Sequence, residues 1–352
     1  MSAAAQPYRI ERSTRASRVG LALSLVAVAA LVALPLWGDG GSLRLIVEIA
    51  YYLALAQSWN LLAGYGGLVS IGQQAFVGLG AYAMVALTTQ LGVHPLIALP
   101  LGGLAAALMA LPTALVAFRL RGAYFAIGTW VLAEVYRLLI AQDFTLGGGT
   151  GMSLPVSVIT AIGSSRALRE IILYYIALAL GWGSVLVVFL WLRSRLGLAL
   201  TAIRDSAAAA ASIGINNGRT KLAVYAVAAG LAGLVGALAF IEKVRISPNA
   251  AFSLVDWTAN VIFIVVIGGI GSIEGPIIGT VVFFALRGLL ADFGPVYLIL
   301  LGLIAIAVML VAPRGLWGLV QHRLGIELFP VQRRVRLLDE TARRGPTDAQ
   351  PG

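Results

Sequence analysis

The longest charge-poor stretch of this chain constrains its fold more than any other feature. From Leu45 to Phe118 the only formally charged residue is Glu48. A run of that length predicts repeated membrane spans, because each crossing of the bilayer core takes about 20 mostly apolar residues. Such long, uniformly apolar runs favour helices over the alternating strands of a membrane barrel. Only 11% of the 352 residues are charged, whereas soluble domains carry about 25%. We therefore expect an all-α, polytopic transmembrane helical bundle.

About ten helical spans are expected, near residues 20–37, 43–63, 73–91, 95–118, 123–141, 170–192, 222–241, 257–270, 275–290 and 294–312. The first span follows four arginines, Arg9, Arg12, Arg15 and Arg18. A secretory signal peptide also has a positively charged segment before its apolar core. Its core is too long for a signal peptide and no small-residue cleavage site follows Trp37, so we interpret it as an uncleaved span. This gives an N-terminal segment (1–19), a membrane domain (20–312) and a basic C-terminal tail (313–352), which is expected to be partly disordered beyond Gln321.

The distribution of basic residues predicts the orientation. If the N-terminus is cytoplasmic, the segments 119–122, 193–221 and 313–352 lie on that same side. Together with residues 1–19 they hold 18 of the 25 lysines and arginines. This is the bias expected from the positive-inside rule, so both termini are expected to be cytoplasmic. The net charge of +10 is then a topology signal rather than a nucleic-acid footprint.

Several kinds of chemistry are unsupported. The chain has no cysteine and only two histidines, His94 and His322, so we expect no metal site. ATP hydrolysis needs a G-x-x-x-x-G-K-[ST] phosphate loop, and neither Lys221 nor Lys243 lies in one. With no nucleophile–base constellation either, the chain is not expected to be an enzyme. Ion-coupled carriers usually need buried Asp, Glu or His relays, and few candidates are present.

Two glycine-rich segments share the pattern Gly-Gly-x-x-Ser-Ile, one beginning at Gly66 and the other at Gly268. Each follows an apolar span and leads into another. Matching breaks of this kind indicate an internal repeat with discontinuous helices around a central pathway. Gln73 and Gln74 could hydrogen-bond a substrate or only satisfy the broken backbone, and the sequence leaves both readings open. The candidate pathway residues are Gly66, Gly67, Ser70, Gln73, Gln74, Gly268, Gly269, Ser272 and Glu274.

Charged side chains inside spans are costly and need partners. Glu134 and Arg137 lie three residues apart, which predicts a local ion pair. Glu48 can snorkel or pair with Arg44. Glu274 precedes Pro276, where a helix N-terminus would favour a carboxylate, so a capping role is expected. Glycines recur at spacings that let helices approach closely, and these are Gly230, Gly233, Gly236, Gly271, Gly275 and Gly279.

The longest expected cytoplasmic loop, 193–221, contains an alanine run that favours a short helix. Asp205 and Ser206 are N-cap candidates and Gly214 is a plausible end. The helix would lie along the membrane, either anchored to anionic lipid or docking a cytoplasmic partner.

Within this loop, Ala202-Ile203-Arg204-Asp205 followed by Ala209-Ala210-x-x-x-Gly214-Ile215-Asn216 resembles the coupling loop of ABC-importer permeases. The closest likeness is to branched-chain amino-acid permeases of the LivM type. The similarity extends over about residues 45–320. It is carried by Asn60–Gly72 with Ala75-Phe76, Arg121–Ile127 with Ala133–Val135, Gly147–Gly151, Val266–Ser272 and Ala312–Leu316.

The resemblance implies a permease subunit of an ATP-driven importer of branched-chain amino acids in the bacterial inner membrane. It implies alternating access, a homologous second permease subunit, two ABC ATPases that use ATP and Mg²⁺, and a periplasmic amino-acid-binding protein. No cofactor is expected on this chain itself. The implied coupling residues are Arg204, Asp205, Ala209, Ala210, Gly214, Ile215 and Asn216.

One departure concerns the coupling loop, because the glutamates that relatives often place around its alanines are missing. Docking would then depend on shape at Ala209, Ala210 and Gly214, and on charge at Arg204 and Asp205. Urea, amides or other amino acids remain alternative substrates. An ion-coupled carrier and a membrane scaffold or channel are the rival classes.

Overall fold

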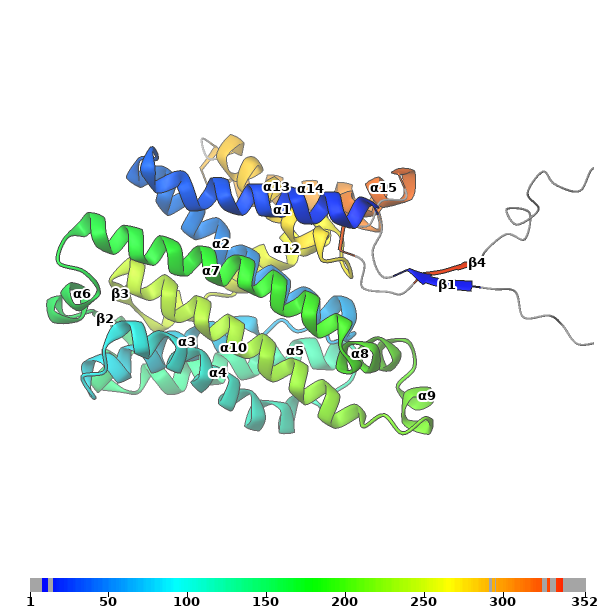
Figure 1. Cartoon of the computed structure of the whole chain (residues 1–352). Helices are drawn as coiled ribbons and strands as arrows, with labels where there is room; N and C mark the ends of the chain where they lie inside the picture. The colour runs from blue at the N-terminus through cyan, green and yellow to red at the C-terminus, as the bar shows by residue number, and fades with distance from the viewer. Residues whose placement is uncertain are drawn as a thin grey trace, which may run out of the picture.

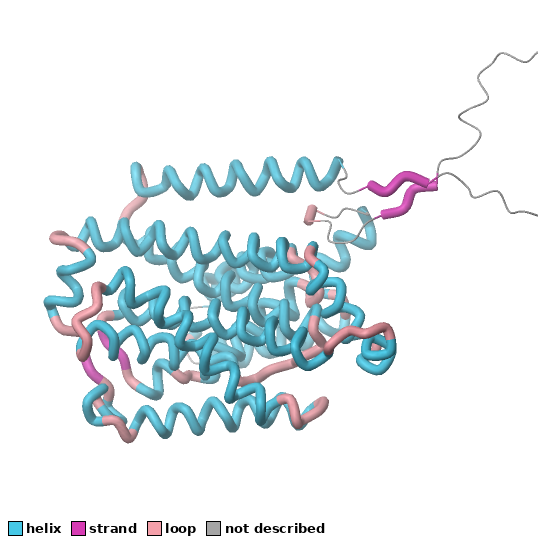
Figure 2. Tube along the Cα trace, turned by 60° about the horizontal axis from the view of Figure 1, so that its bottom comes forward, coloured by secondary structure: helices cyan, strands magenta, loops and turns pink. Residues whose placement is uncertain are grey.

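The computed structural model describes residues 8–11, 15–290, 293–294, 296–324, 328–329 and 334–337, and most of them are helical (Figure 2). The tail beyond Gln321 therefore lies mostly outside the described residues. The α-helices are α1 (Arg15–Ala33), α2 (Gly40–Asn60), α3 (Gln73–Thr89), α4 (Pro95–Ala117), α5 (Ala123–Ala141), α6 (Val156–Ile162), α7 (Arg166–Arg193), α8 (Arg195–Asp205), α9 (Ala207–Ser212), α10 (Asn217–Lys243), α11 (Pro248–Ala251), α12 (Asn260–Gly268), α13 (Glu274–Leu290), α14 (Val296–Val311) and α15 (Gly315–Leu324).

Short elements complete the chain. Two π-helices, η2 (Leu61–Tyr65) and η5 (Val255–Ala259), continue α2 and precede α12. The 3₁₀-helices are η1 (Leu34–Leu36), η3 (Phe144–Leu146) and η4 (Gly148–Thr150). Two antiparallel strand pairs join β1 (Tyr8–Glu11) to β4 (Arg334–Leu337), and β2 (Met152–Ser153) to β3 (Arg245–Ile246).

Within the part of the chain that the structure describes, seven helical segments are long and apolar enough to cross a membrane, so the expected all-α membrane class is confirmed. They are Gly40–Tyr65, Pro95–Ala117, Ala123–Ala141, Arg166–Arg193, Asn217–Lys243, Pro248–Gly268 and Val296–Gln321. The other three expected spans correspond to α1, α3 and α13. In α1 the apolar part is the shorter stretch Ala22–Leu36. Helices α3 and α13 have 17 residues each, because each begins only after a glycine break.

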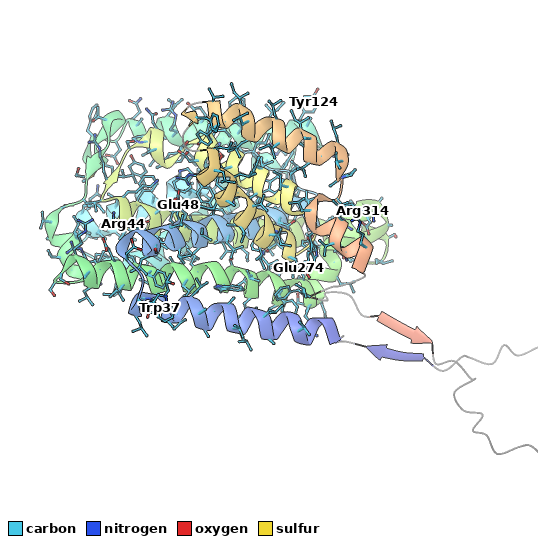
Figure 3. The ribbon with its side chains drawn as sticks, turned by 90° about the horizontal axis from the view of Figure 1, so that it is seen from above. Trp37, Arg44, Glu48, Tyr124, Glu274 and Arg314 are labelled. Atoms are coloured by element: carbon cyan, nitrogen blue, oxygen red, sulfur yellow. The ribbon has the colours of Figure 1, made fainter. Side chains whose placement is uncertain are left out.

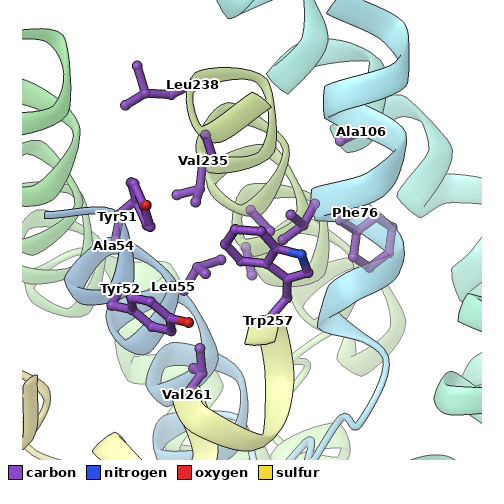
Figure 4. Packing of buried hydrophobic residues seen from close by; sticks show 14 of the residues in the cluster. Tyr51, Tyr52, Ala54, Leu55, Phe76, Ala106, Val235, Leu238, Trp257 and Val261 are labelled. Carbon is purple, nitrogen blue, oxygen red and sulfur yellow. The ribbon is translucent and has the colours of Figure 1, made fainter. Parts of the chain in front are cut away.

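The core lies around α2 and α10. Every residue from Ala50 to Tyr65 is buried, so the second half of α2 and all of η2 are enclosed by other helices. Trp257, only 1% exposed, packs against both helices, because its ring meets Tyr52 of α2 and Phe240 of α10, and Leu55 and Val235 lie close to it (Figure 4). The Tyr52 and Trp257 rings are stacked with their centroids 6.4 Å apart. Aromatic burial of this kind contributes strongly to core packing.

Glycine allows the closest helix contacts, as the spacing predicted. A Cβ atom at Gly236 of α10 would overlap the Val77 carbonyl of α3, and one at Gly80 would overlap the backbone of Gly233. In the same way, a Cβ atom at Gly279 of α13 would overlap the Ile264 carbonyl of α12. These helices touch backbone to backbone, which suits a membrane where lipid provides no hydrophobic drive for packing.

The arrangement gives the bundle two distinct ends (Figure 1). The start of α1, the helices α8 and α9, and α15 gather at one end, which we call the loop end. The starts of α2 and α7, the C-terminus of α10 and helix α6 gather at the other, which we call the far end. Arg44 and Glu48 lie toward the far end, whereas Glu274 and Arg314 lie toward the loop end (Figure 3).

Candidate functional site

The second glycine break is held on α2 by two buried amide side chains. Asn60 Nδ2 donates to the Ser272 carbonyl oxygen at 2.8 Å, and Asn60 Oδ1 accepts from the Gly271 N–H at 2.8 Å. Gln57 Nε2 donates to the Ile273 carbonyl at 2.8 Å. A broken membrane helix leaves backbone groups that need such partners. The second break therefore lies against the end of α2, just before the first break.

The first break is bound to its neighbours in a similar manner. Trp59 Nε1 donates to the Ser70 carbonyl at 2.8 Å, and Thr129 Oγ1 of α5 accepts from the Ile71 N–H at 3.1 Å. The Ser70 hydroxyl accepts from the Gly72 N–H at 3.2 Å. These bonds satisfy the irregular backbone locally.

Gln73 and Gln74 are buried and bonded within the protein. Gln73 Nε2 donates to the Leu55 carbonyl at 3.0 Å and to Ser58 Oγ at 2.7 Å. Thr258 of η5 donates its hydroxyl proton to Gln74 Oε1 and accepts from the Gln74 N–H. Neither side chain bonds the backbone of a break, and Gln73 Oε1 is buried without a hydrogen-bond partner in the described chain, so a role in substrate contact stays a prediction.

Both breaks contain glycines in conformations that other residues rarely adopt. Gly67 has φ 65°, Gly269 has φ 131° and Gly271 has φ 80°. Since L-residues are strained in this region, glycine is needed there. In the second break the Ser272 hydroxyl donates to the Gly269 carbonyl at 2.9 Å and accepts from the Gly275 N–H at 3.1 Å. Gly66 and Gly268 close the helices that lead into the breaks.

Glu274 lies in the first turn of α13 and is 6% exposed. Its Oε1 accepts from the backbone N–H groups of Leu328 at 2.9 Å and Phe329 at 2.8 Å. The Phe329 ring also meets Phe189 of α7, with centroids 6.0 Å apart. Beyond its place at a helix start, Glu274 therefore anchors the chain that follows α15.

The 193–221 loop forms two helices rather than one. Helix α9 was expected, with Ser206 as its N-cap accepting from the Ala209 N–H at 3.2 Å and Gly214 beyond its end at φ 87°. Helix α8 was missed, although an N-cap serine at Ser194 and apolar residues at helical spacing, Leu196, Leu200 and Ile203, were a usable signal. Asn216 caps the following helix α10 by accepting from the Arg219 N–H at 3.0 Å.

Exposure separates the expected coupling residues. Arg204, Asp205, Ala209 and Gly214 are exposed, and Ile215 is half-buried. Ala210 is only 2% exposed, so it packs inward and is not available for shape docking. The neighbouring Ile213, which we did not single out, is 74% exposed.

Arg204 links the loop to the first break. Its Nη1 donates to the Gly64 carbonyl oxygen of η2 at 3.0 Å, while its Nη2 lies 3.0 Å from Asp205 Oδ1. Two residues after Gly64 comes Gly66, where the helix ends. Arg204 therefore joins α8 to the π-helical turn that precedes the first break.

Ion pairs join the far end of the bundle. Glu48 pairs with Arg287 of α13 at 2.6 Å, and Arg44 pairs with Glu170 of α7 at 2.7 Å. The expected pairing of Glu48 with Arg44 is wrong, because helix packing offers each a partner on another helix. The local pair of Glu134 and Arg137 is confirmed, and Arg137 also donates to Asn249 Oδ1 at 2.7 Å.

Two adjoining cavities occupy the far end, away from the glycine breaks. The larger has a volume of about 630 Å³ and lies between the start of α2, α6, the start of α7 and the end of α10. The smaller, about 200 Å³, reaches toward Trp257 and Asn260. Sequence reasoning missed both, although charges clustered at 166–170 and 242–245 between spans were a usable signal. The candidate pathway residues line neither cavity.

Among the described residues, no cluster of histidine, cysteine, aspartate or glutamate could hold a metal ion. The family described as branched-chain amino acid transport system, permease component, matches residues 41–313. The chain belongs to this family. The match includes both breaks, α8, α9 and both cavities. As the permease component of an ABC transporter, this family member is a multi-pass membrane protein and is not itself an enzyme.

Two relatives carry the name high-affinity branched-chain amino acid transport system permease protein LivM. The one from Salmonella typhimurium (strain LT2) is 30% identical over 327 residues, covering 87% of this permease and 76% of the relative. The one from Escherichia coli (strain K12) is 30% identical over 334 residues, covering 88% and 78%. No solved structure matches this chain significantly.

Proposed function

We propose that this chain is a LivM-type permease subunit of an ATP-driven importer that moves branched-chain amino acids by alternating access. The observation that carries the proposal is the bond from Arg204 to Gly64. It connects the exposed loop of α8 and α9 to η2, the buried turn before the first break. An ATPase that binds the loop from outside needs such a connection to act on the pathway. The names of the two LivM relatives support branched-chain amino acids as substrates, with urea, amides or other amino acids as alternatives.

In the proposed topology the chain spans the membrane ten times, with α1, α3 and α13 added to the seven longer segments. The loop end is cytoplasmic, as are both termini. Support comes from the basic residues of the loop end, because positive charge concentrates on the cytoplasmic side.

An internal repeat is part of the proposal. Each break follows a helix with a π-helical turn, η2 or η5, and leads into a 17-residue helix. In each break a serine hydroxyl, of Ser70 or Ser272, accepts from a backbone N–H a few residues later. Related breaks in two halves are typical of transport pathways.

The partners follow from the mechanism. A homologous second permease would complete the pathway, and a periplasmic binding protein would deliver the substrate. One of two cytoplasmic ATPases would dock on α8 and α9 and the other on the second permease, and both would use ATP and Mg²⁺, since this chain has no phosphate loop. The chain itself would bind no cofactor.

Replacement of a single exposed glycine tests the docking role. Gly214→Leu should uncouple ATP hydrolysis from leucine uptake in proteoliposomes that hold the complete transporter. Gly92→Leu is the matched control, because Gly92 also has positive φ and open space around its Cβ position but lies between α3 and α4. Unchanged uptake with Gly214→Leu would remove α9 from the docking surface.

The energy source separates this function from its rivals. Uptake should require ATP inside the vesicles and survive a protonophore. Loss of uptake with a protonophore while ATP is plentiful would indicate an ion-coupled carrier, and uptake without ATP would indicate a channel.

A further inference from the structure

The larger cavity lies far from the coupling loop. It meets α7 at Arg166, and α7 enters the loop only after Arg193. A 28-residue helix is about 40 Å long at 1.5 Å per residue. If the loop end is cytoplasmic, the cavity lies toward the opposite membrane face, from which substrate would arrive.

One wall of the cavity is suited to an anion. Arg166 and Arg169 lie in the first turn of α7, where the helix dipole adds positive potential. Arg166 is committed to Glu170 at 3.0 Å. Arg169 makes one side-chain hydrogen bond within the described chain, from Nη1 to the Gly163 carbonyl at 3.3 Å. Since a guanidinium has five N–H donors, Arg169 retains donors for a carboxylate.

Another wall is suited to a cation. Glu242 lies in the last turn of α10, where the helix dipole is negative and disfavours a second negative charge. Its Oε2 atom is buried and has no hydrogen-bond partner in the described chain. The adjacent Lys243 ammonium lies over the Trp257 ring, 4.9 Å from its centroid. An unpaired buried carboxylate oxygen is costly, and an ammonium ligand would satisfy it.

The remaining wall is apolar and comes from α2, α6, α7 and α10. Its residues are Leu43, Val47, Ile159, Ile162, Leu173 and Ile241. The cavity volume of about 630 Å³ falls within the 300–1,000 Å³ typical of small-molecule sites.

We propose that this cavity is a receiving site for a zwitterionic amino acid with an apolar side chain. Arg169 binds the α-carboxylate, Glu242 binds the α-ammonium, and the apolar wall takes the side chain. The inference rests on the proposed function and adds to it a substrate site within this subunit. An ethanolamine phospholipid headgroup carries the same pair of charges, so the test must separate it from a free amino acid.

Ligand analogues test the charge pairing without altering the protein. The purified permease–ATPase complex, without binding protein or nucleotide, is placed in phosphatidylglycerol nanodiscs and titrated with leucine, 4-methylpentanoate or 3-methylbutylamine. Leucine should bind about 10-fold more tightly than either analogue, as expected when each analogue leaves one charged group unpaired. Absence of leucine binding, or equal affinities, would overturn the proposal. A third outcome would also overturn it: if phosphatidylethanolamine in the nanodisc abolishes leucine binding, the site belongs to lipid.

Two variants test which residue binds each charged group of the ligand. Glu242→Gln should weaken leucine about 10-fold and leave 4-methylpentanoate unchanged. Arg169→Gln should weaken leucine and 4-methylpentanoate but leave 3-methylbutylamine unchanged, and the retained ligand shows that each variant is folded. Arg245→Gln is the control, because Arg245 is exposed nearby and does not line the cavity. Wild-type leucine affinity in both test variants would refute the assignment.

Uptake by the complete transporter distinguishes failure of the proposed function from failure of the receiving site. If the wild-type complex with its binding protein and ATP does not import leucine, the proposed function fails. If it does, and both variants import leucine at the wild-type rate and affinity, only the receiving site fails.

Discussion

Arg204 and Gly64 are 140 residues apart in the chain and are joined by a hydrogen bond of 3.0 Å from Nη1 to the carbonyl oxygen. The acceptor belongs to the π-helical turn η2, and π turns inside helices often mark functional sites. The donor belongs to α8, the first helix of the loop that is proposed to dock an ATPase. This bond directly connects that loop to the turn that precedes the first glycine break.

Removal of this bond should separate hydrolysis from transport. We expect Arg204→Gln to lower leucine uptake about 10-fold, since bonds from charged donors are worth about 1.5–3 kcal/mol, while ATPase activity persists. Arg195→Gln is the matched control, because it makes the same change at an exposed position on the same helix. Both rates are measured in proteoliposomes. Equal losses in the two variants would point to overall charge instead of the bond.

Asn60 should be sensitive to loss of its donor group. Asn60→Asp keeps one acceptor but leaves the Ser272 carbonyl without its partner and buries a charge. We expect a loss of about 1–3 kcal/mol in unfolding free energy, measured by thermal unfolding of the purified protein in detergent. Gln142→Glu makes the same amide-to-acid change on the surface and should stay within about 0.5 kcal/mol of wild type. Similar stabilities for the two variants would contradict the bridging role.

Two glycine-to-alanine changes should act in opposite directions. In Gly236→Ala the new methyl group would overlap the Val77 carbonyl, so overpacking should cost about 1–3 kcal/mol. In Gly183→Ala the methyl group enters open space on α7, and the gain in helix propensity should be up to about 1 kcal/mol. Denaturant titration in mixed micelles measures both, and a shared sign would disprove the close contact of α3 and α10.

The pair of Glu48 and Arg287 should show energetic coupling between α2 and α13. Each single change, Glu48→Gln or Arg287→Gln, should lower the unfolding free energy by about 0.5–1 kcal/mol, because both side chains are partly exposed and solvent screens their attraction. The double variant should recover part of that loss. A double-mutant cycle measures the coupling, and strict additivity of the two losses would show that the pair contributes nothing.

Local signals in the sequence predicted much of the helical framework. Charge-free runs predicted the spans, the alanine run with Ser206 predicted α9, and the spacing of Glu134 and Arg137 predicted their ion pair. Each of these features depends on residues within a few positions of one another. Helix α8 was missed although its cap residue and its apolar spacing are local signals. Helix α3 ends two residues before the expected span of 73–91, whereas α13 agrees with the expected span of 275–290 to within one residue.

Within the candidate site, the sequence located both breaks but not their contacts. The clamp of Asn60 on Gly271 and Ser272 spans more than 200 residues, and no local pattern indicates it. The inward face of Ala210 also depends on packing, since helix propensity does not say which side of a short helix is covered.

Neighbouring residues were enough to predict a multi-span helical membrane protein, the positions of its helix breaks and the exposed loop. Hydrophobicity, glycine conformation and capping are local properties, so they can be read from neighbouring residues. By contrast, the folded arrangement of the helices was needed to see that Arg204 reaches Gly64 and that Glu48 pairs with Arg287 instead of Arg44. It was also needed to see that Arg169 and Glu242 line one cavity. Those contacts depend on how whole helix faces pack together. Side chains interact with the groups that packing brings near them in space, however far apart they are along the chain.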